Sequence, residues 1–275
     1  MSIVAISETV GSQGTDIGYQ LSRALSWDFA DREIIAKAAE RYGEGVMELQ
    51  HVTEEKPTLW ERFIDSKRHY LSYVEATIFE MAARDRAVLV GHGAAIILRE
   101  ISHVLRVRMT APEALRAQRV RQQQGFASDS TALDFVRDTD RERASRMRFL
   151  YHVDVDDPLL YDFAINTERL TVEGSVRLIR AALERELVEP TTRSLALAHD
   201  LSLAAQARAR LLVDPTTRRL RLSVAAADGR LKVVGMADSE ALRDTALAIV
   251  EGVPGAAGVT DEIDVVPIPP RYVGM

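Results

Sequence analysis

Residues 2–18 read Ser2-Ile-Val-Ala-Ile-Ser-Glu-Thr-Val-Gly11-Ser-Gln-Gly14-Thr15-Asp16-Ile-Gly18. The apolar run at 3–6 predicts a buried strand, and apolar residues recur at helical spacing after the glycines. A strand, a glycine-punctuated turn and a helix N-terminus can together bind phosphate. Glycine lets backbone N–H groups converge on an anion, and the helix end adds partial positive charge. The stretch therefore predicts an α/β fold with an anion-binding turn.

The turn carries only part of the phosphate-loop signature, which is G-x-x-x-x-G-K-[ST]. Gly14 can serve as the second glycine, but Thr9 occupies the first glycine position, Thr15 the lysine position and Asp16 the last position. A tight turn without a ligand is therefore an open alternative. A dinucleotide loop, with Asp31 as the ribose-binding acid, ranks lower because the glycines lack the G-x-G-x-x-G spacing.

Composition narrows the class of protein. The 275 residues suffice for two domains, and a formal net charge of −6 argues against nucleic-acid binding. The absence of cysteine excludes disulfides, thiolate metal sites and a cysteine nucleophile. No leader-like segment and no apolar run of membrane-spanning length occur in the sequence. We therefore expect a cytoplasmic protein that is not integral to a membrane.

Further apolar runs at 87–90, 104–109 and 161–165 predict strands that alternate with helical patterns, among them 33–41, 58–84 and 171–187. This order predicts a parallel sheet wound by helices on both faces.

The second strand leads into Gly91-His92-Gly93, at the end of the sheet where such folds bind ligands. His92 can equally be structural. Asp31 either caps the next helix or, with Arg32, contacts a second substrate.

Residues 99–148 contain eleven arginines, seven acidic residues and no lysine. Guanidinium groups bind phosphate oxygens bidentately and keep their charge near neutral pH. Two pairs share helix faces by spacing, Arg137 with Arg141 and Arg143 with Arg146. The alternative is a solvated helix with local ion pairs.

Several segments match one known pattern in one order. They are Gly11-Ser12-Gln13-Gly14 with Asp16-Ile17, Asp31-Arg32-Glu33-Ile34-Ile35, Val90-Gly91-His92-Gly93-Ala94, Asp140-Arg141-Glu142-Arg143, and Asp157-Pro158-Leu159-Leu160-Tyr161-Asp162 through Ile165-Asn166-Thr167. Over about residues 2–187 the chain resembles the cytidylate kinase-like family, nucleoside monophosphate kinases with the P-loop fold.

The resemblance implies phosphoryl transfer from ATP, with Mg²⁺ carried by the nucleotide, to a nucleoside monophosphate such as CMP or dCMP. Such chemistry needs positioning and charge stabilisation and no covalent nucleophile. The implied ATP-phosphate ligands are Gly11, Ser12, Gln13, Gly14, Thr15 and Asp16. The implied monophosphate ligands are Asp31, Arg32, Gly91, His92 and Gly93. The implied catalytic residues are the lid arginines Arg137, Arg141, Arg143 and Arg146, in a lid at about 110–150.

Two positions depart from the family pattern. Thr15 replaces the lysine that would bridge the β- and γ-phosphates, so a lid arginine would have to substitute for it. His92 stands where the pattern has arginine in Gly-Arg-Gly. Loss of one such charge-stabilising group costs about 3 kcal/mol in the transition state. The alternative function is therefore a weak or inactive nucleotide-binding regulator.

A second domain is expected after a linker at 188–193. Residues 194–210 predict a helix, two alternating runs flank an Asp228-Gly229 hairpin turn, and a helix and a last strand follow. This α-β-β-α-β order resembles a BON domain over 194–275, after a first domain at 1–187. The resemblance implies a small ligand, a lipid or a protein as its partner. Ten basic and ten acidic residues from Pro190 onward give no electrostatic membrane patch, so a regulatory or interaction role is favoured.

Overall fold

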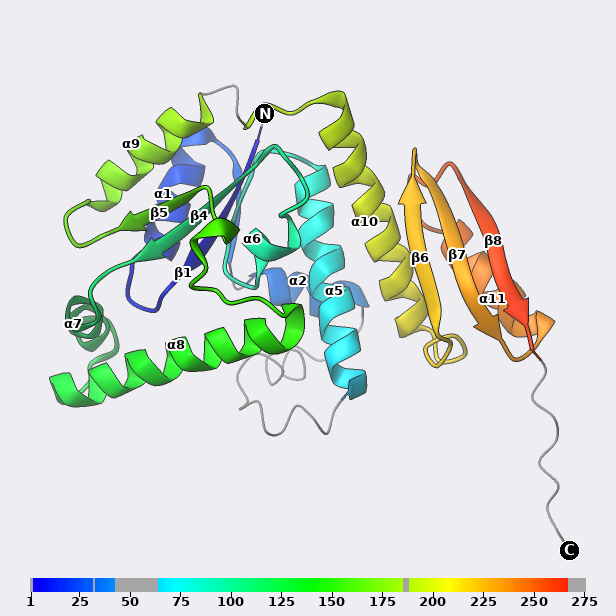
Figure 1. Ribbon diagram of the computed structural model, residues 1–275, viewed down its shortest axis with the longest axis horizontal. Coiled ribbons are helices and arrows are strands. Elements are labelled where there is room, and N and C mark those ends of the chain that lie inside the picture. The colour runs from blue at the N-terminus through cyan, green and yellow to red at the C-terminus, as the bar shows by residue number, and fades with distance from the viewer. Residues whose placement is uncertain (1, 32, 43–63, 185–187, 267–275) are drawn as a thin grey trace, which may run out of the picture.

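The computed structural model describes residues 2–31, 33–42, 64–184 and 188–266 (Figure 1). Its main sheet has five parallel strands in the order β2-β3-β1-β4-β5. They are β1 (Ile3–Glu8), β2 (Asp28–Ala30), β3 (Ala87–Val90), β4 (Val104–Thr110) and β5 (Phe163–Asn166). The strands predicted at 3–6, 87–90 and 104–109 are confirmed. The one predicted at 161–165 begins two residues later, because a 3-10 turn, η1 (Pro158–Leu160), closes on Tyr161.

Helices cover both faces of this sheet, as predicted. Val4 and Ile6 of β1 pack in a core with α1 (Gly14–Leu25) and α9 (Val172–Leu183). Ile3 and Ala5 lie on the opposite face, in a core with α2 (Glu33–Tyr42), α5 (Ile64–Ala83) and α6 (Ala94–Ile97). The first part of the helix predicted at 58–84 lies outside the described residues.

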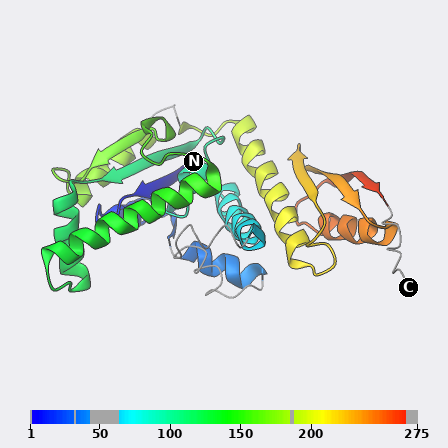
Figure 2. The same cartoon turned by 60° about the horizontal axis from the view of Figure 1, so that its bottom comes forward.

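Two helices connect β4 to β5 and form an arm beside the sheet. They are α7 (Glu113–Gln124) and α8 (Asp129–Tyr151). The side chain of Ser128 caps α8 by accepting a hydrogen bond from the Thr131 amide at 3.1 Å. Helix α8 runs along the edge where β1 and β4 end (Figures 1 and 2). This arm corresponds to the expected lid.

The C-terminal part has the predicted α-β-β-α-β order. Its elements are α10 (Thr192–Val213), β6 (Leu222–Ala227), β7 (Arg230–Ala237), α11 (Glu240–Glu251) and β8 (Gly258–Val265). The sheet is mixed, with β6 antiparallel and β8 parallel to the central β7. Asp228 and Gly229 both have positive φ, at 52° and 77°, which is the backbone that the predicted hairpin turn requires.

Helix α10 takes part in two hydrophobic cores. Ala205 and Leu212 pack into the core that contains α5, alongside which α10 runs in Figure 1. Leu203, Ala207 and Leu211 pack into the core of the C-terminal sheet. The C-terminal domain is therefore attached through the side of a shared helix.

Candidate functional site

The turn between β1 and α1 has a tightly constrained backbone. Gly11 and Gln13 have φ of 77° and 64°, in the left-handed region. The buried Ser12 hydroxyl donates to the Thr9 carbonyl at 2.7 Å, and the Ser12 amide donates to the same carbonyl at 3.1 Å. A side chain at Gly11 would place its Cβ 2.7 Å from the Arg116 carbonyl oxygen, so both the φ and the contact require glycine. Ser12, expected as a phosphate ligand, uses its hydroxyl within the turn.

Two arginines of α7 hold the turn from outside. Arg116 is buried and donates to the Val10 carbonyl at 3.0 Å and to the Asp140 carboxylate at 2.5 Å. Arg119 donates to the Gly11 carbonyl at 3.3 Å and to the side chain and carbonyl of Thr167 at 2.9 and 2.7 Å. Both residues belong to the arginine-rich region, but the sequence did not indicate this bracing role. They fix the turn before any ligand arrives.

Glu8 is a residue of the site that the sequence reasoning missed. Its carboxylate accepts from the Thr15 amide at 3.2 Å and from the Thr15 hydroxyl at 3.3 Å. The same hydroxyl lies 3.3 Å from an oxygen of Asp31. Burial raises the pKa of Glu8 above its ordinary value of 4.5, and the neighbouring Asp31 charge adds to the rise, whereas Arg143 and the Thr15 hydrogen bonds oppose it.

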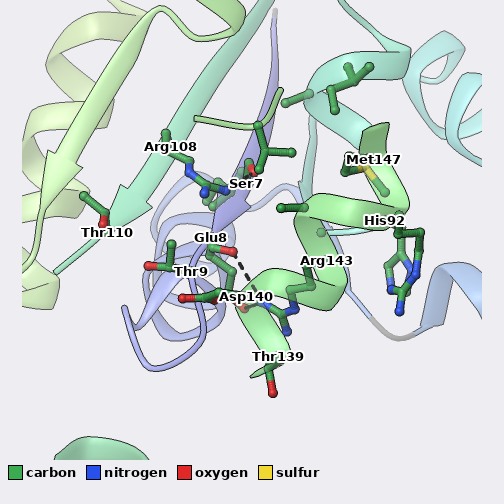
Figure 3. A pocket seen from close by; sticks show the side chains of 18 of the residues that line it. Ser7, Glu8, Thr9, His92, Arg108, Thr110, Thr139, Asp140, Arg143 and Met147 are labelled. Carbon is green, nitrogen blue, oxygen red and sulfur yellow. Dashed lines mark hydrogen bonds and ion pairs between the residues drawn. The ribbon is translucent and has the colours of Figure 1, made fainter. Parts of the chain in front are cut away.

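A cavity of about 790 Å³ opens at the carboxyl ends of β1, β3 and β4, beneath α8. Its size lies in the range of small-molecule sites. Glu8 from β1 and Arg143 from α8 lie next to one another in its lining, as Figure 3 shows. The Arg143 guanidinium donates to the Glu8 carbonyl at 3.3 Å and lies 4.0 Å from a Glu8 carboxylate oxygen. Charges of both signs therefore line the cavity.

The four expected lid arginines divide between two faces of α8. Arg143 and Arg146 line the cavity. Arg137 instead pairs with Glu113, and Arg141 pairs with Asp138 at 3.1 Å with 74% of its side chain exposed. The placement of these two outside the cavity lining gives no support to a catalytic role for them.

The expected acceptor residues lie on the other side of the cavity. Asp31 and the Gly91-His92-Gly93 turn line it, whereas Arg32 lies outside the described residues. All three residues of the turn have positive φ, and His92 does so at 51°, a conformation that non-glycine residues seldom adopt. Asp16, expected as a phosphate ligand, is exposed on the first turn of α1.

Arg108 is a second residue of the cavity that the sequence did not single out. It extends from β4 and donates to the Ser7 hydroxyl at 2.8 Å and to Asp156 at 3.2 Å. Its guanidinium lies over the Tyr161 ring, 5.8 Å from the centroid. Arg108 therefore places a positive charge on the β4 side of the cavity, whereas His92 lies on its β3 side.

A comparison with known protein families matches residues 3–169 to the cytidylate kinase-like family, which is more than half of the chain. The chain belongs to the cytidylate kinase-like family. Residues 199–267 match the BON domain. The two matched segments correspond to the two sheets of the fold.

Curated relatives of this cytidylate kinase-like protein bear the same kind of name. It is 28% identical over 181 residues to "Cytidylate kinase" of Pyrobaculum calidifontis. The matched residues are 65% of this chain and 90% of that relative. It is 26% identical over 185 residues to "Cytidylate kinase" of Thermococcus sibiricus, covering 66% and 88%. An uncharacterized protein from Eubacterium ventriosum superposes on 67% of the chain and all of its own length, with a TM-score of 0.53 and 18% identity, which supports the fold alone.

The described residues set limits on other kinds of site. Among them, no three histidine, aspartate or glutamate side chains are grouped so as to hold a metal ion. None of the helices within the described ranges has the length and apolarity needed to cross a bilayer.

Proposed function

We propose that this protein transfers the γ-phosphoryl group of ATP to the phosphate of a nucleoside monophosphate, with CMP or dCMP as the acceptor. The observation that carries the proposal is one cavity whose lining includes Thr9, at the start of the turn at 9–15, and two arginines of α8, Arg143 and Arg146. The curated relatives named cytidylate kinase support this acceptor class.

In this proposal the turn binds the ATP phosphates through backbone N–H groups of Gly11 and residues 13–16 and the N-terminus of α1. The bond from the γ-phosphorus to the bridging oxygen of ADP breaks while a bond to an acceptor phosphate oxygen forms. Arg143 and Arg146 stabilise the charge spread over the transferring group, and no protein nucleophile takes part. They also take over the charge of the missing loop lysine, at whose position Thr15 stands.

The acceptor lies, in this proposal, against Asp31 and the Gly91-His92-Gly93 turn. Mg²⁺ enters as part of the nucleotide substrate and is held by phosphate oxygens. The hydroxyl of Thr15 and the carboxylate of Asp31 are hard oxygen donors of the kind that Mg²⁺ prefers, so the residues at this end of the turn are compatible with it.

A coupled assay of ADP release with purified protein, Mg·ATP and a panel of monophosphates tests the proposal. We expect turnover with CMP and dCMP above that with AMP, GMP and UMP, and CDP as a product by chromatography. The absence of ADP and CDP with every monophosphate would refute phosphoryl transfer.

A second candidate function is a nucleotide-binding regulator whose C-terminal domain takes a small ligand, a lipid or a protein as its partner. The observation that favours it is the shared helix α10, which joins the two cores. This function predicts Mg·ATP binding by calorimetry without CDP formation. It also predicts a change in ATP affinity when residues 214–266 are deleted. An unchanged affinity in that variant would count against it.

A further inference from the structure

The carboxylate of Glu8 lies directly over the turn that the proposed function assigns to phosphate. It accepts hydrogen bonds from the amide and hydroxyl of Thr15, at the first turn of α1. It is also close to Gly14, where a Cβ would lie 2.6 Å from Glu8 Oε2. The Glu8 carboxylate, a negatively charged group of the protein, therefore lies at the N-terminus of α1.

A carboxylate and a phosphate compete for such a position, because both are anionic acceptors for the same free N–H groups. The Thr15 amide already donates to Glu8 Oε2, so a phosphate oxygen gains that donor only if the carboxylate leaves. A phosphate that bound beside an unmoved carboxylate would also face like charge at close range.

We propose that Glu8 is an internal occupant of the phosphate-binding turn and that nucleotide phosphate binds by displacing its carboxylate toward Arg143. The proposal rests on the proposed function in that it takes residues 11–16 as the nucleotide site. It makes Glu8 a residue that sets nucleotide affinity, in addition to the arginines that stabilise the transferring group.

The surroundings of Glu8 provide a destination for the displaced carboxylate. Arg143 donates to the Glu8 carbonyl, and the same nitrogen is 4.0 Å from Glu8 Oε1, just beyond a direct hydrogen bond. A short movement of the Glu8 side chain closes that gap and exchanges a neutral donor for a charged one. Displacement is therefore coupled to α8, the helix that carries the cavity arginines.

Calorimetric titration of the full chain with Mg·ATP tests the displacement. Glu8→Gln keeps the shape and removes the charge, and we expect it to bind about tenfold more tightly than wild type near neutral pH, as loss of one charged hydrogen bond predicts. Glu8→Ala serves as a second variant should Gln disturb folding, and is expected to tighten binding as well. Glu142→Gln is the matched control: it removes one charge from the same cavity lining, on α8, and is expected to change affinity less than about twofold.

Equal affinities of wild type, Glu8→Gln and Glu8→Ala would overturn the displacement while leaving the CDP assay to decide on phosphoryl transfer. Tighter binding by Glu8→Gln without CDP formation would support displacement and refute phosphoryl transfer. Absence of binding by all three proteins would overturn both.

Discussion

Asp140, on α8, accepts a hydrogen bond from the backbone amide of Val10 at 3.0 Å. The two residues are 130 positions apart in the chain, and the contact ties α8 to the turn between β1 and α1. The other oxygen of Asp140 pairs with the buried Arg116, which donates back to the Val10 carbonyl. One carboxylate thus fixes both the turn and the arginine that holds it.

The first prediction concerns this carboxylate. Asp140→Ala leaves the buried Arg116 guanidinium without its charged partner and the Val10 amide without its acceptor. We expect the free energy of unfolding to fall by about 1–3 kcal/mol and Mg·ATP affinity to fall with it, measured by urea denaturation and calorimetry. Asp138→Ala is the matched control, because Asp138 is exposed and pairs only with Arg141 among the ion pairs of the described residues. A loss of similar size in the control would contradict this role of Asp140.

The second prediction separates the two faces of α8. Arg143→Ala is expected to lower kcat about 100-fold in the CDP assay, because the proposed function assigns this guanidinium to the transferring phosphoryl group. Arg141→Ala, on the exposed face, is expected to change kcat less than about twofold. Equal effects of the two substitutions would show that Arg143 acts only through the general charge of the helix.

The third prediction follows from the raised pKa of Glu8. Since the folded state holds this proton more tightly than the unfolded state, ionisation of Glu8 lowers stability as pH rises from its ordinary value of 4.5 through the folded pKa. We therefore expect Glu8→Gln to have a higher Tm than wild type near neutral pH. The difference in Tm should vanish below about pH 4. A constant difference across the pH range, measured by scanning calorimetry, would exclude ionisation as its cause.

The fourth prediction concerns the shared helix α10. Leu212 is 4% exposed and packs in the core that contains α5. Leu212→Ala is expected to cost about 2–5 kcal/mol and to lower the unfolding temperature of both domains together, seen as one calorimetric transition. Leu195→Ala, at a position that is 45% exposed, is expected to change stability by about 0.5 kcal/mol or less. Two separate transitions in the Leu212 variant would show that the domains unfold independently.

The buried strands could be predicted because parallel strands covered on both faces are continuous apolar runs. Residues 3–6 and 87–90 are such runs, and every residue in them is buried. The C-terminal hairpin was equally clear, since Asp228-Gly229 is a strong turn signal between alternating runs. The dual packing of α10 was not predictable, because an Ala- and Leu-rich helix does not indicate which neighbours it will have.

The sequence indicated some of the side chains that line the cavity but not the charged residues Glu8 and Arg108. Helical spacing grouped the arginines of α8 correctly, yet it did not show which pair faces the cavity. The apolar residues Val136, Met147 and Leu150 share a stripe with Arg143 by their spacing, and this signal identifies the inward face. Glu8 was missed because the phosphate-loop motif does not consider the last strand residue. Side chains alternate between the two faces of a strand, so Glu8 lies on the same face of β1 as Ile6, the face that α1 covers.

The packing of α10 into two cores has a mechanical consequence. A domain joined by a short flexible linker can reorient freely. A domain that packs along the side of a helix can move only if that helix moves. Force applied to the β6-β7-β8 sheet is therefore transmitted to α5, which leads directly into β3 and the strained His92 turn. A movement of the C-terminal sheet is thus coupled through α10 and α5 to the Gly91-His92-Gly93 side of the cavity.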